Sequence, residues 1–184
     1  MKLRFPLLLA ALLALAASLA AADRALTFDP ARSTLEIAVK ATMDSFTGKL
    51  AAYELTATVN EAGQVTSAQM DFRFADVLTG KPKRDKAMHE WQQTEKYPDA
   101  RFVLTSLQQE SGAGSVAFGR LTLHGVTREL SFPVKVSREG ATYAIDGDAP
   151  VDTREFGLPV IRMMGLLKVD PVVRVKFHLQ GKTS

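Results

Sequence analysis

Few side chains in this sequence are placed to do chemistry. The three histidines stand apart: His89 lies in a helical pattern, His124 in a turn and His178 on the polar side of a strand pattern. None belongs to a His-x-x-x-His or His-Glu-x-x-His motif, and the chain has no cysteine. Because zinc and related metals are held by His and Cys at such spacings, the sequence predicts no metal site.

The groups that nucleophilic catalysis needs are not brought together by any motif. No serine occupies a Gly-x-Ser-x-Gly elbow. The acidic turn Asp146-Gly147-Asp148 lacks the further oxygen ligands of a calcium loop. We therefore assign no catalytic residues and expect the protein not to be an enzyme.

Four basic residues, Lys81, Lys83, Arg84 and Lys86, form the clearest concentration of charge. Such a basic cluster can receive a phosphate group or touch an anionic membrane, and it can equally be a solvated loop. We treat these four residues as candidate contacts with a lipid head group or with a membrane surface.

The element that would carry the basic cluster is a helix. Ala87, Met88 and Trp91 recur at three- and four-residue spacing among polar side chains, which is typical of a helix with one narrow apolar face. Because Pro98 restricts Tyr97, the helix is expected to stop there. Met88 and Trp91 are either core anchors or ligand contacts. Inserted in a chain of strands, such a helix can plug or roof a barrel.

The rest of the chain beyond residue 34 alternates between apolar and polar residues, which is the period of β-strands. Eight strands with mostly short connections predict an all-β fold, an eight-stranded antiparallel barrel with one short helix inserted between strands. A sandwich is the alternative, but closure into a barrel removes exposed edges. The predicted strands are 35–39, 53–59, 65–75, 101–107, 116–123, 130–136, 143–145 and 173–179.

Two places depart from simple alternation. The phase of the apolar residues changes at Gly119, which predicts a β-bulge. Residues 42–48 are predicted to form a loop that carries Phe46.

The interior of an eight-stranded barrel is either filled by side chains or holds one small ligand. The expected inner face carries several phenylalanines but also Ala57 and Ala68, so the sequence leaves both outcomes open. Segment 158–167, LPVIRMMGLL, is apolar without alternation, and it either caps the barrel or contacts a ligand. For a hollow barrel, the candidate lining residues are Ile37, Val39, Phe46, Phe72, Phe74, Met88, Trp91, Phe102, Phe118, Phe132, Tyr143, Phe156, Met163, Met164 and Phe177.

Residues 1–22 have the layout of a secretory signal peptide. Lys2 and Arg4 precede an apolar run over 7–17, and small residues lead to Asp23. The run is shorter than the ~20 residues of a membrane span, which argues against the alternative of an uncleaved anchor. We expect residues 23–184 to form one exported domain that is stabilised without disulfides.

The charge of that domain is nearly balanced. The whole chain has 23 Lys and Arg against 20 Asp and Glu, and loss of the leader removes Lys2 and Arg4. Binding to nucleic acid calls for a strong positive excess. We therefore expect no nucleic-acid partner.

Several short motifs, taken in their order, resemble the YceI-like polyisoprenoid-binding family. The similarity spans about residues 27–181. The motifs are Phe28-Asp29-Pro30 with Ser33; Phe46-Thr47-Gly48; Arg84-Asp85 leading to Tyr97-Pro98 and Phe102; Gly119-x-Leu121-Thr122-x-x-Gly125-Val126-Thr127; and Arg154-x-Phe156-Gly157.

The resemblance implies a lipocalin-like eight-stranded barrel in the bacterial periplasm. Its apolar tunnel would hold an isoprenoid lipid, such as a quinone tail or a polyprenyl lipid, with transient contact to a membrane surface and no catalytic cofactor. Some relatives are encoded or fused with b561-type membrane cytochromes, which implies a membrane redox partner. Two further functions stay open: a small-ester hydrolase on the same scaffold, and a ligand-free partner of a b561-type redox complex.

Overall fold

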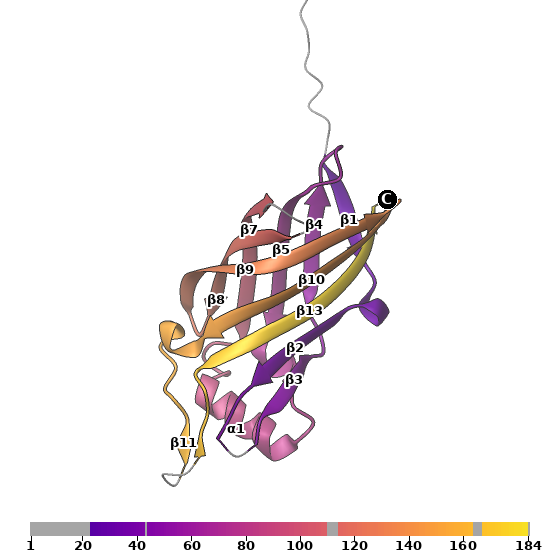
Figure 1. The fold of residues 1–184 in the computed structure, drawn as a ribbon. Coiled ribbons are helices and arrows are strands. Elements are labelled where there is room, and N and C mark those ends of the chain that lie inside the picture. The colour runs from indigo at the N-terminus through magenta and orange to yellow at the C-terminus, as the bar shows by residue number, and fades with distance from the viewer. Residues whose placement is uncertain (1–22, 43, 110–113, 164–166, 184) are drawn as a thin grey trace, which may run out of the picture.

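The structure, a computed structural model, describes residues 23–42, 44–109, 114–163 and 167–183. Most of these residues belong to β-strands, as the sequence predicts, and the longest strands cross the whole molecule (Figure 1). None of the helices in these ranges is both long and apolar enough to cross a membrane. The elements are β1 (Arg24–Phe28), η1 (Pro30–Arg32), β2 (Thr34–Val39), β3 (Phe46–Leu50), β4 (Glu54–Val59), β5 (Val65–Arg73), η2 (Phe74–Asp76), β6 (Val77–Leu78), α1 (Pro82–Gln92), β7 (Asp99–Gln109), β8 (Ser115–Leu123), β9 (Val126–Glu139), β10 (Thr142–Asp152), η3 (Thr153–Phe156), β11 (Arg162–Met163), β12 (Leu167–Lys168) and β13 (Val172–Thr183).

Eight strands close into a ring in the order β1-β4-β5-β7-β8-β9-β10-β13, and β13 pairs back onto β1. Every neighbouring pair in the ring is antiparallel. The predicted eight-stranded antiparallel barrel with one inserted helix is therefore confirmed. Closure matters because it pairs backbone groups that an open sheet would expose along its edges.

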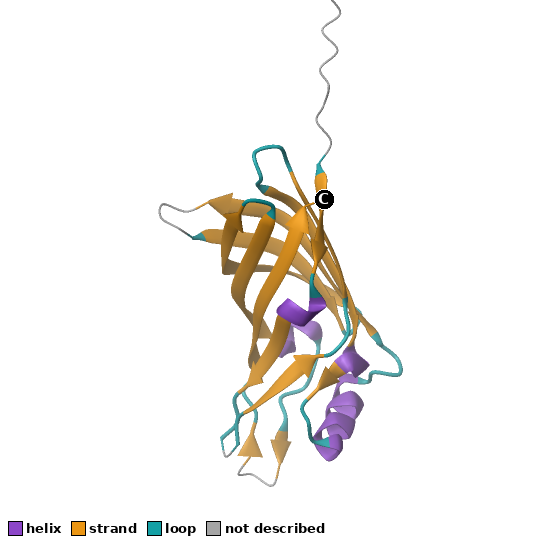
Figure 2. Cartoon of the chain, turned by 90° about the vertical axis from the view of Figure 1, so that its right-hand side faces the viewer, coloured by secondary structure: helices purple, strands orange, loops and turns teal. Residues whose placement is uncertain are grey.

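The ring closes through β1, a strand that the sequence analysis did not identify. One edge of the long strand β13 pairs with β10. The other edge has two partners: the last residues pair with β1, and the segment Arg174 to His178 pairs with β2. Between β1 and β2 the chain bends at η1, where the Asp29 carboxylate accepts a hydrogen bond from the Ala31 amide at 3.0 Å. As a result, β2 leaves the ring at its lower end (Figures 1 and 2).

The predicted loop over 42–48 is wrong from Phe46 onward, where strand β3 begins. From Phe46 onward the chain pairs with β2, with Phe46 opposite Val39 and Gly48 opposite Ile37. Strand β6 then pairs with β3. The pairing of β3 with β2 is a local hairpin, and a short segment that contains Gly and Lys becomes a strand because β2 offers it an edge.

The phase change predicted at Gly119 is wrong for β8, which keeps one phase throughout, and the bulge near Gly119 lies on the neighbouring strand β7. The register of β7 against β8 shifts between Leu104 and Ser106, which places Thr105 opposite no residue of β8. The Thr105 hydroxyl donates a hydrogen bond to the Phe118 carbonyl at 3.0 Å. The buried positions of β8 are all odd-numbered, so the side chain of Phe118 falls on the outer side of the barrel wall.

Two glycines make room for aromatic rings inside the barrel. A Cβ atom at Gly119 would lie only 2.7 Å from the Val103 carbonyl oxygen and would overlap the Phe102 ring. A Cβ atom at Gly147 would overlap the Phe177 ring. These two rings flank Phe132, at centroid distances of 5.7 and 6.1 Å, so three aromatic rings lie side by side on the inner wall of the barrel.

Helix α1 lies at the lower end of the barrel, beside β3 (Figures 1 and 2). Pro82 occupies its first turn, where the missing N–H costs nothing. The helix ends at Gln92, before Pro98 is reached, because Gln93 turns left-handed with φ of 55°. The amide of Thr94 then donates to the His89 carbonyl and ends the helix in a Schellman-type turn.

We expect Gly119→Ala to destabilise the fold by about 2 kcal/mol, because the new methyl group meets a backbone carbonyl as well as a ring. Gly114→Ala is the matched control, since nothing lies within 4 Å of the atom it would add. The free energy of unfolding from chemical denaturation decides between them. Equal stability of the two variants would contradict the packing described for Gly119.

Candidate functional site

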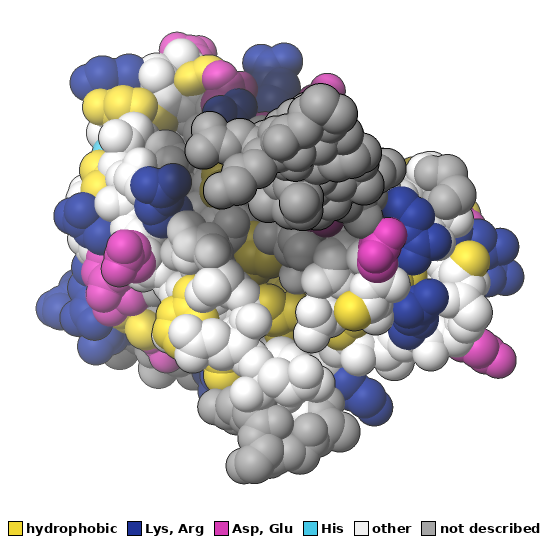
Figure 3. All heavy atoms as spheres, turned by 90° about the horizontal axis from the view of Figure 1, so that it is seen from above, with side chains coloured by type: hydrophobic (Ala, Val, Ile, Leu, Met, Phe, Trp, Pro, Cys, Tyr) yellow, Lys and Arg dark blue, Asp and Glu magenta, His cyan; other side chains and the backbone are white. Residues whose placement is uncertain are grey.

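The barrel encloses an apolar cavity of about 250 Å3. It extends from Val65, beside the β4–β5 hairpin at the upper end, to Leu158 below η3 at the lower end. Among the described residues its wall presents no polar surface. Seen from the upper end, charged side chains lie mainly around the outside and hydrophobic ones nearer the middle (Figure 3). The interior of this barrel is hollow rather than filled.

Small and large side chains alternate on the wall of the cavity. Ala57, Ala68, Ala117 and Ala149 line it together with phenylalanines. Nine of the predicted lining residues are in place: Ile37, Val39, Phe72, Phe74, Met88, Trp91, Phe102, Phe132 and Phe177.

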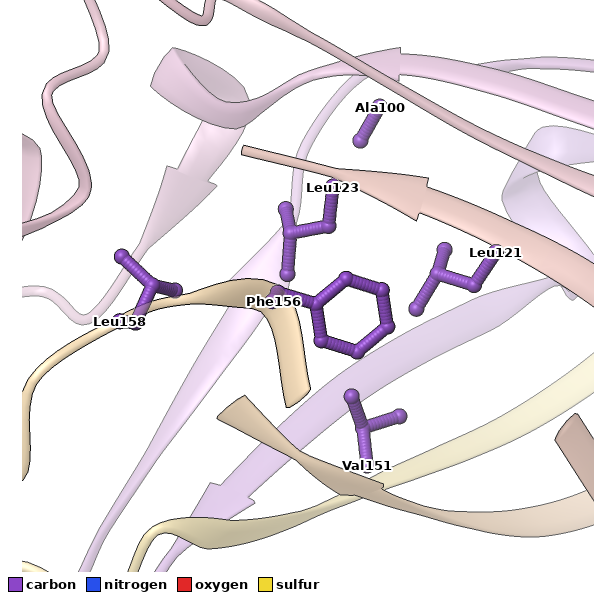
Figure 4. Close-up of a cluster of buried hydrophobic side chains, with 6 residues drawn as sticks. All are labelled: Ala100, Leu121, Leu123, Val151, Phe156 and Leu158. Atoms are coloured by element: carbon purple, nitrogen blue, oxygen red, sulfur yellow. The ribbon is translucent and has the colours of Figure 1, made fainter. Parts of the chain in front are cut away.

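Two predicted lining residues are instead fully buried in the barrel's packing. Tyr143 belongs to a cluster with Leu26 and Val59, and its hydroxyl donates to the Gly63 carbonyl at 3.2 Å. Phe156 is the centre of a second cluster at the lower end (Figure 4). Both point inward, as predicted, but neighbouring side chains cover them, so neither lines the cavity.

Two other predicted lining residues lie away from the cavity for different reasons. Phe118 falls on the outer side because the inward positions of β8 are odd-numbered along the whole strand. The ring of Phe46 makes a cation–π contact with the guanidinium group of Arg84, whose Cζ atom lies 4.1 Å from the ring centroid. Met163 is in β11, but its side chain and all of Met164 are outside the described residues.

Aliphatic residues of the same strands complete the wall, and the sequence analysis did not single them out. Val173, Val175 and Leu179 line the cavity beside Phe177, on the same face of β13. The alternation that identified Phe177 could have identified all of them, because residues two apart on a strand share a face. The remaining lining residues that were missed include Phe28, Leu35, Leu50, Leu55, Met70, Leu104, Leu107, Leu121, Leu123, Leu130, Ile145, Val151 and Leu158.

The lower end of the cavity is covered by α1 and by the chain around η3. Met88 and Trp91, one turn apart on α1, face the cavity. The Trp91 indole N–H donates to the Pro159 carbonyl at 2.8 Å, which ties the helix to the segment after η3. Phe156 and Leu158 pack beneath with Val151, Leu121 and Leu123 (Figure 4).

His124 supports this lower end without lining the cavity. Its Nδ1 atom lies 2.9 Å from the Phe156 carbonyl oxygen, and its ring meets Tyr97 at a centroid distance of 4.3 Å. The turn between β8 and β9 is thereby fixed against both η3 and the segment after α1.

The basic cluster lies on and before α1, outside the cavity. Lys81 and Arg84 both approach the Asp44 carboxylate, at 4.0 and 3.3 Å. Lys86 pairs with Glu90 along the helix, and Lys83 is exposed. The basic cluster therefore lies beside the lower end of the cavity, at the helix that covers this end.

Asp85 fixes the start of α1. Its carboxylate accepts hydrogen bonds from the Thr79 hydroxyl at 2.6 Å and the Thr79 amide at 2.9 Å. The Thr79 hydroxyl is the main cause that holds the pKa of Asp85 below its usual value, with further help from the amide and from nearby positive charge. A negative charge here also suits the helix dipole.

Within the described ranges, no three His, Asp or Glu side chains gather as metal ligands would. The one histidine–carboxylate pair, His178 with Asp146 at 2.7 Å, lies on the outer face of the barrel. The enclosed site can therefore exclude water and hold an apolar chain, and its described wall offers no group for acid–base chemistry.

The sequence matches the family model of the YceI-like domain over residues 26–181. It is similar to a UPF0312 protein of Pseudomonas putida, with 32% identity over 79 residues, which is 42% of this chain and 41% of that protein. A UPF0312 protein of Pseudomonas syringae pv. tomato is 24% identical over 103 residues, covering 52% of this chain and 54% of that protein. The chain thus matches about half or less of the length of these curated relatives.

Two solved structures share the fold. BcnA from Burkholderia cenocepacia aligns with a TM-score of 0.73 and 25% identity, covering 84% of this chain and 99% of that chain. A polyisoprenoid binding domain from Saccharophagus degradans, implicated in plant cell wall breakdown, aligns with a TM-score of 0.67 and 19% identity, covering 89% and 100%.

The matched region begins within β1 and ends within β13. It therefore includes the closing pair of strands, α1 and the residues that line the cavity. The chain belongs to the family of YceI-like domains.

Proposed function

We propose that this protein is an exported, periplasmic carrier that holds an isoprenoid lipid in its barrel. The observation that carries the proposal is the apolar cavity, which extends from Val65 to Leu158 inside a closed ring of strands. The Saccharophagus degradans domain of similar fold is described as polyisoprenoid binding, which favours this class of ligand. A quinone tail and a polyprenyl lipid are the two ligands that we consider.

The size of the cavity supports an occupant. An unfilled cavity destabilises a protein by about 24 cal/mol per Å3, so a cavity of about 250 Å3 costs about 6 kcal/mol. That is comparable to the whole stability of a typical domain. A hydrocarbon chain in the cavity restores the missing contacts and offsets this cost.

The same wall argues against the other functions. A hydrolase needs a nucleophile and a base beside its substrate, and the described wall of the cavity presents no polar surface. A ligand-free partner of a membrane redox complex would need no hollow interior. A b561-type membrane partner for the loaded carrier stays a prediction.

Exchange with a membrane follows from energetics. Each buried methylene is worth ~0.8 kcal/mol against water, so a long isoprenoid almost never enters the aqueous phase. Against a bilayer the transfer is nearly balanced, because lipid tails are as apolar as the cavity wall. Uptake therefore requires the protein to touch the membrane, and we propose that it does so with the basic cluster beside the lower end of the cavity. Leu78, which is 47% exposed next to this cluster, adds an apolar contact.

We expect protein exported from bacteria to release an isoprenoid lipid on solvent extraction, and delipidated protein to bind a polyprenyl quinone in a one-to-one complex. Native mass spectrometry measures both. Protein that carries no extractable lipid and binds neither a quinone nor a polyprenol would refute the carrier function.

Filling the cavity should weaken binding. In Ala68→Phe the new ring enters the cavity and displaces about two methylenes of the ligand, which lowers the affinity about tenfold. Ala141→Phe, at an exposed turn, is the control and should bind as the wild type does. Fluorescence quenching by the bound quinone reports the affinity, and equal affinities would show that the ligand binds elsewhere.

The membrane contact predicts a charge-dependent rate. Lys83→Gln with Lys86→Gln should slow lipid uptake from anionic vesicles by about thirtyfold, since each lysine near such a surface is worth about 1 kcal/mol. Neutral vesicles should show little change, and high salt should reduce the difference. Lys135→Gln with Lys176→Gln, on the outer wall, is the matched control. Equal slowing by both pairs would place the contact surface elsewhere.

A further inference from the structure

Helix α1 covers the lower end of the cavity with few apolar contacts. Met88 and Trp91 are its two side chains that line the cavity. Most of its other residues are charged or polar, and Ala87 is exposed. The hydrophobic free energy that keeps the helix packed on the barrel therefore comes mainly from the burial of these two side chains.

The inner side of α1 also buries polar groups that are poorly matched. Gln92 is 0% exposed, and neither its Oε1 nor its Nε2 atom has a hydrogen-bond partner among the described residues. The same holds within those residues for His89 Nε2 and Thr94 Oγ1, at the same end of the helix. A buried polar atom without a partner costs the full free energy of its desolvation. Water would relieve this cost if the helix moved away from the barrel.

These polar atoms do not form a head-group site inside the cavity. Gln92 is not among the lining residues, and the described wall presents no polar surface. The ring of His89 lies against Phe74, which lines the cavity and separates the histidine from it. Their effect is therefore on the helix itself.

Backbone pivots flank α1 on both sides. Gly80, just before the helix, has φ of 73° and open space around it. Gln93, just after the helix, has φ of 55°. Such positions can absorb changes of φ and ψ while the helix between them stays intact.

The Asp85–Thr79 hydrogen bonds fix the start of α1 within its own segment, and the contacts that tie this start to the rim of the barrel lie near the surface. Lys81 and Arg84 meet the Asp44 carboxylate, whose side chain is 66% exposed, and Arg84 stacks on Phe46. Exposed ion pairs contribute little and are screened by salt. Asp44 belongs to the connection between β2 and β3, so this latch joins the helix to the neighbouring rim of the barrel.

We propose that α1 is a lid, which pivots at Gly80 and Gln93 and opens the lower end of the cavity to lipid. The closed lid is held by Met88, Trp91 and the Asp44 latch, and it is loosened by the unmatched carboxamide of Gln92. The lid rests on the proposed carrier function for its purpose, but its motion can be measured without any lipid.

Hydrogen–deuterium exchange of the delipidated wild-type protein is the first test. The amides of α1 should exchange faster than those of β8 and β9, which open only when the barrel unfolds. Gln92→Met keeps the length of the side chain and removes its polar atoms, so exchange in α1 should slow by about tenfold, the scale of one unmatched buried group. Asp44→Asn should accelerate it about threefold, as expected for a partly exposed ion pair. Gln108→Met and Asp146→Asn, far from the helix, are the matched controls and should leave α1 unchanged.

Lipid transfer is the second test, with vesicles that contain a polyprenyl quinone or squalene. Gln92→Met should slow the uptake of both lipids by the same factor as it slows exchange, and it should leave both affinities within about twofold. Loss of affinity for the quinone alone would identify a head-group site and overturn the lid. Unchanged uptake despite slower exchange in α1 would also overturn it as the route of entry.

A reversible cross-link is the third test, and it does not depend on whether the Gln92 variant folds. The chain has no cysteine, so Asp44→Cys with Arg84→Cys can be joined specifically by a short cleavable bis-thiosulfonate. Joining should stop uptake, and reduction should restore it. Uptake that continues in the joined protein, or α1 amides that exchange as slowly as β8 and β9, would refute the lid. Wild-type protein that binds neither lipid would refute the carrier function, while the exchange data would still decide on the motion.

Discussion

The edge of β13 that faces away from β10 is divided between two partners, and this division determines the shape of the molecule. The C-terminal residues of β13 pair with β1 and close the ring, whereas its earlier residues pair with β2, which has already turned away at η1. A strand can satisfy its backbone groups only along its two edges, so the free edge of β2 pairs with β3, and β3 pairs with β6, which extends the sheet beyond the ring. The barrel is consequently regular at the upper end and spread at the lower end (Figures 1 and 2). Helix α1 covers the end that the strands do not close among themselves.

The hollow interior follows from how side chains are distributed over this frame. Gly119 and Gly147 let the rings of Phe102 and Phe177 lie close to the backbone of the neighbouring strands, instead of filling the centre. Phe132 stands between these rings, and alanines occupy other positions of the wall. Bulky side chains that would close the interior, such as Tyr143 and Phe156, are drawn into clusters at the two ends of the barrel. The middle therefore stays open while both ends are packed.

Alternation in the sequence was enough to predict the barrel, because each strand has one apolar face and the ring has only one interior. It was not enough to find β1 and β3, which are short and become strands only because β13 and β2 offer them edges. The lining was predicted where a residue's phase is unambiguous, as for Phe177. It was wrong for Phe118, because the phase change predicted at Gly119 does not occur in β8, and for Phe46, whose ring meets a cation 38 positions further along the chain. The direction of a side chain also does not show whether it lines the cavity or is buried by its neighbours. Tyr143 and Phe102 both stand at apolar positions of alternating strands, but only Phe102 lines the cavity.

A wall that presents only apolar surface, although Gln69 and Thr153 belong to it, has a consequence for what such a protein would distinguish. The hydrophobic interaction has no direction, so the cavity can measure the width and length of a chain but not its chemical labels. Among chains of similar cross-section, occupancy would follow the law of mass action and reflect their relative abundance in the membrane that the protein visits. The bound population would then be a sample of that membrane's apolar lipids, and a change in the membrane's composition would change the cargo without any change in the protein.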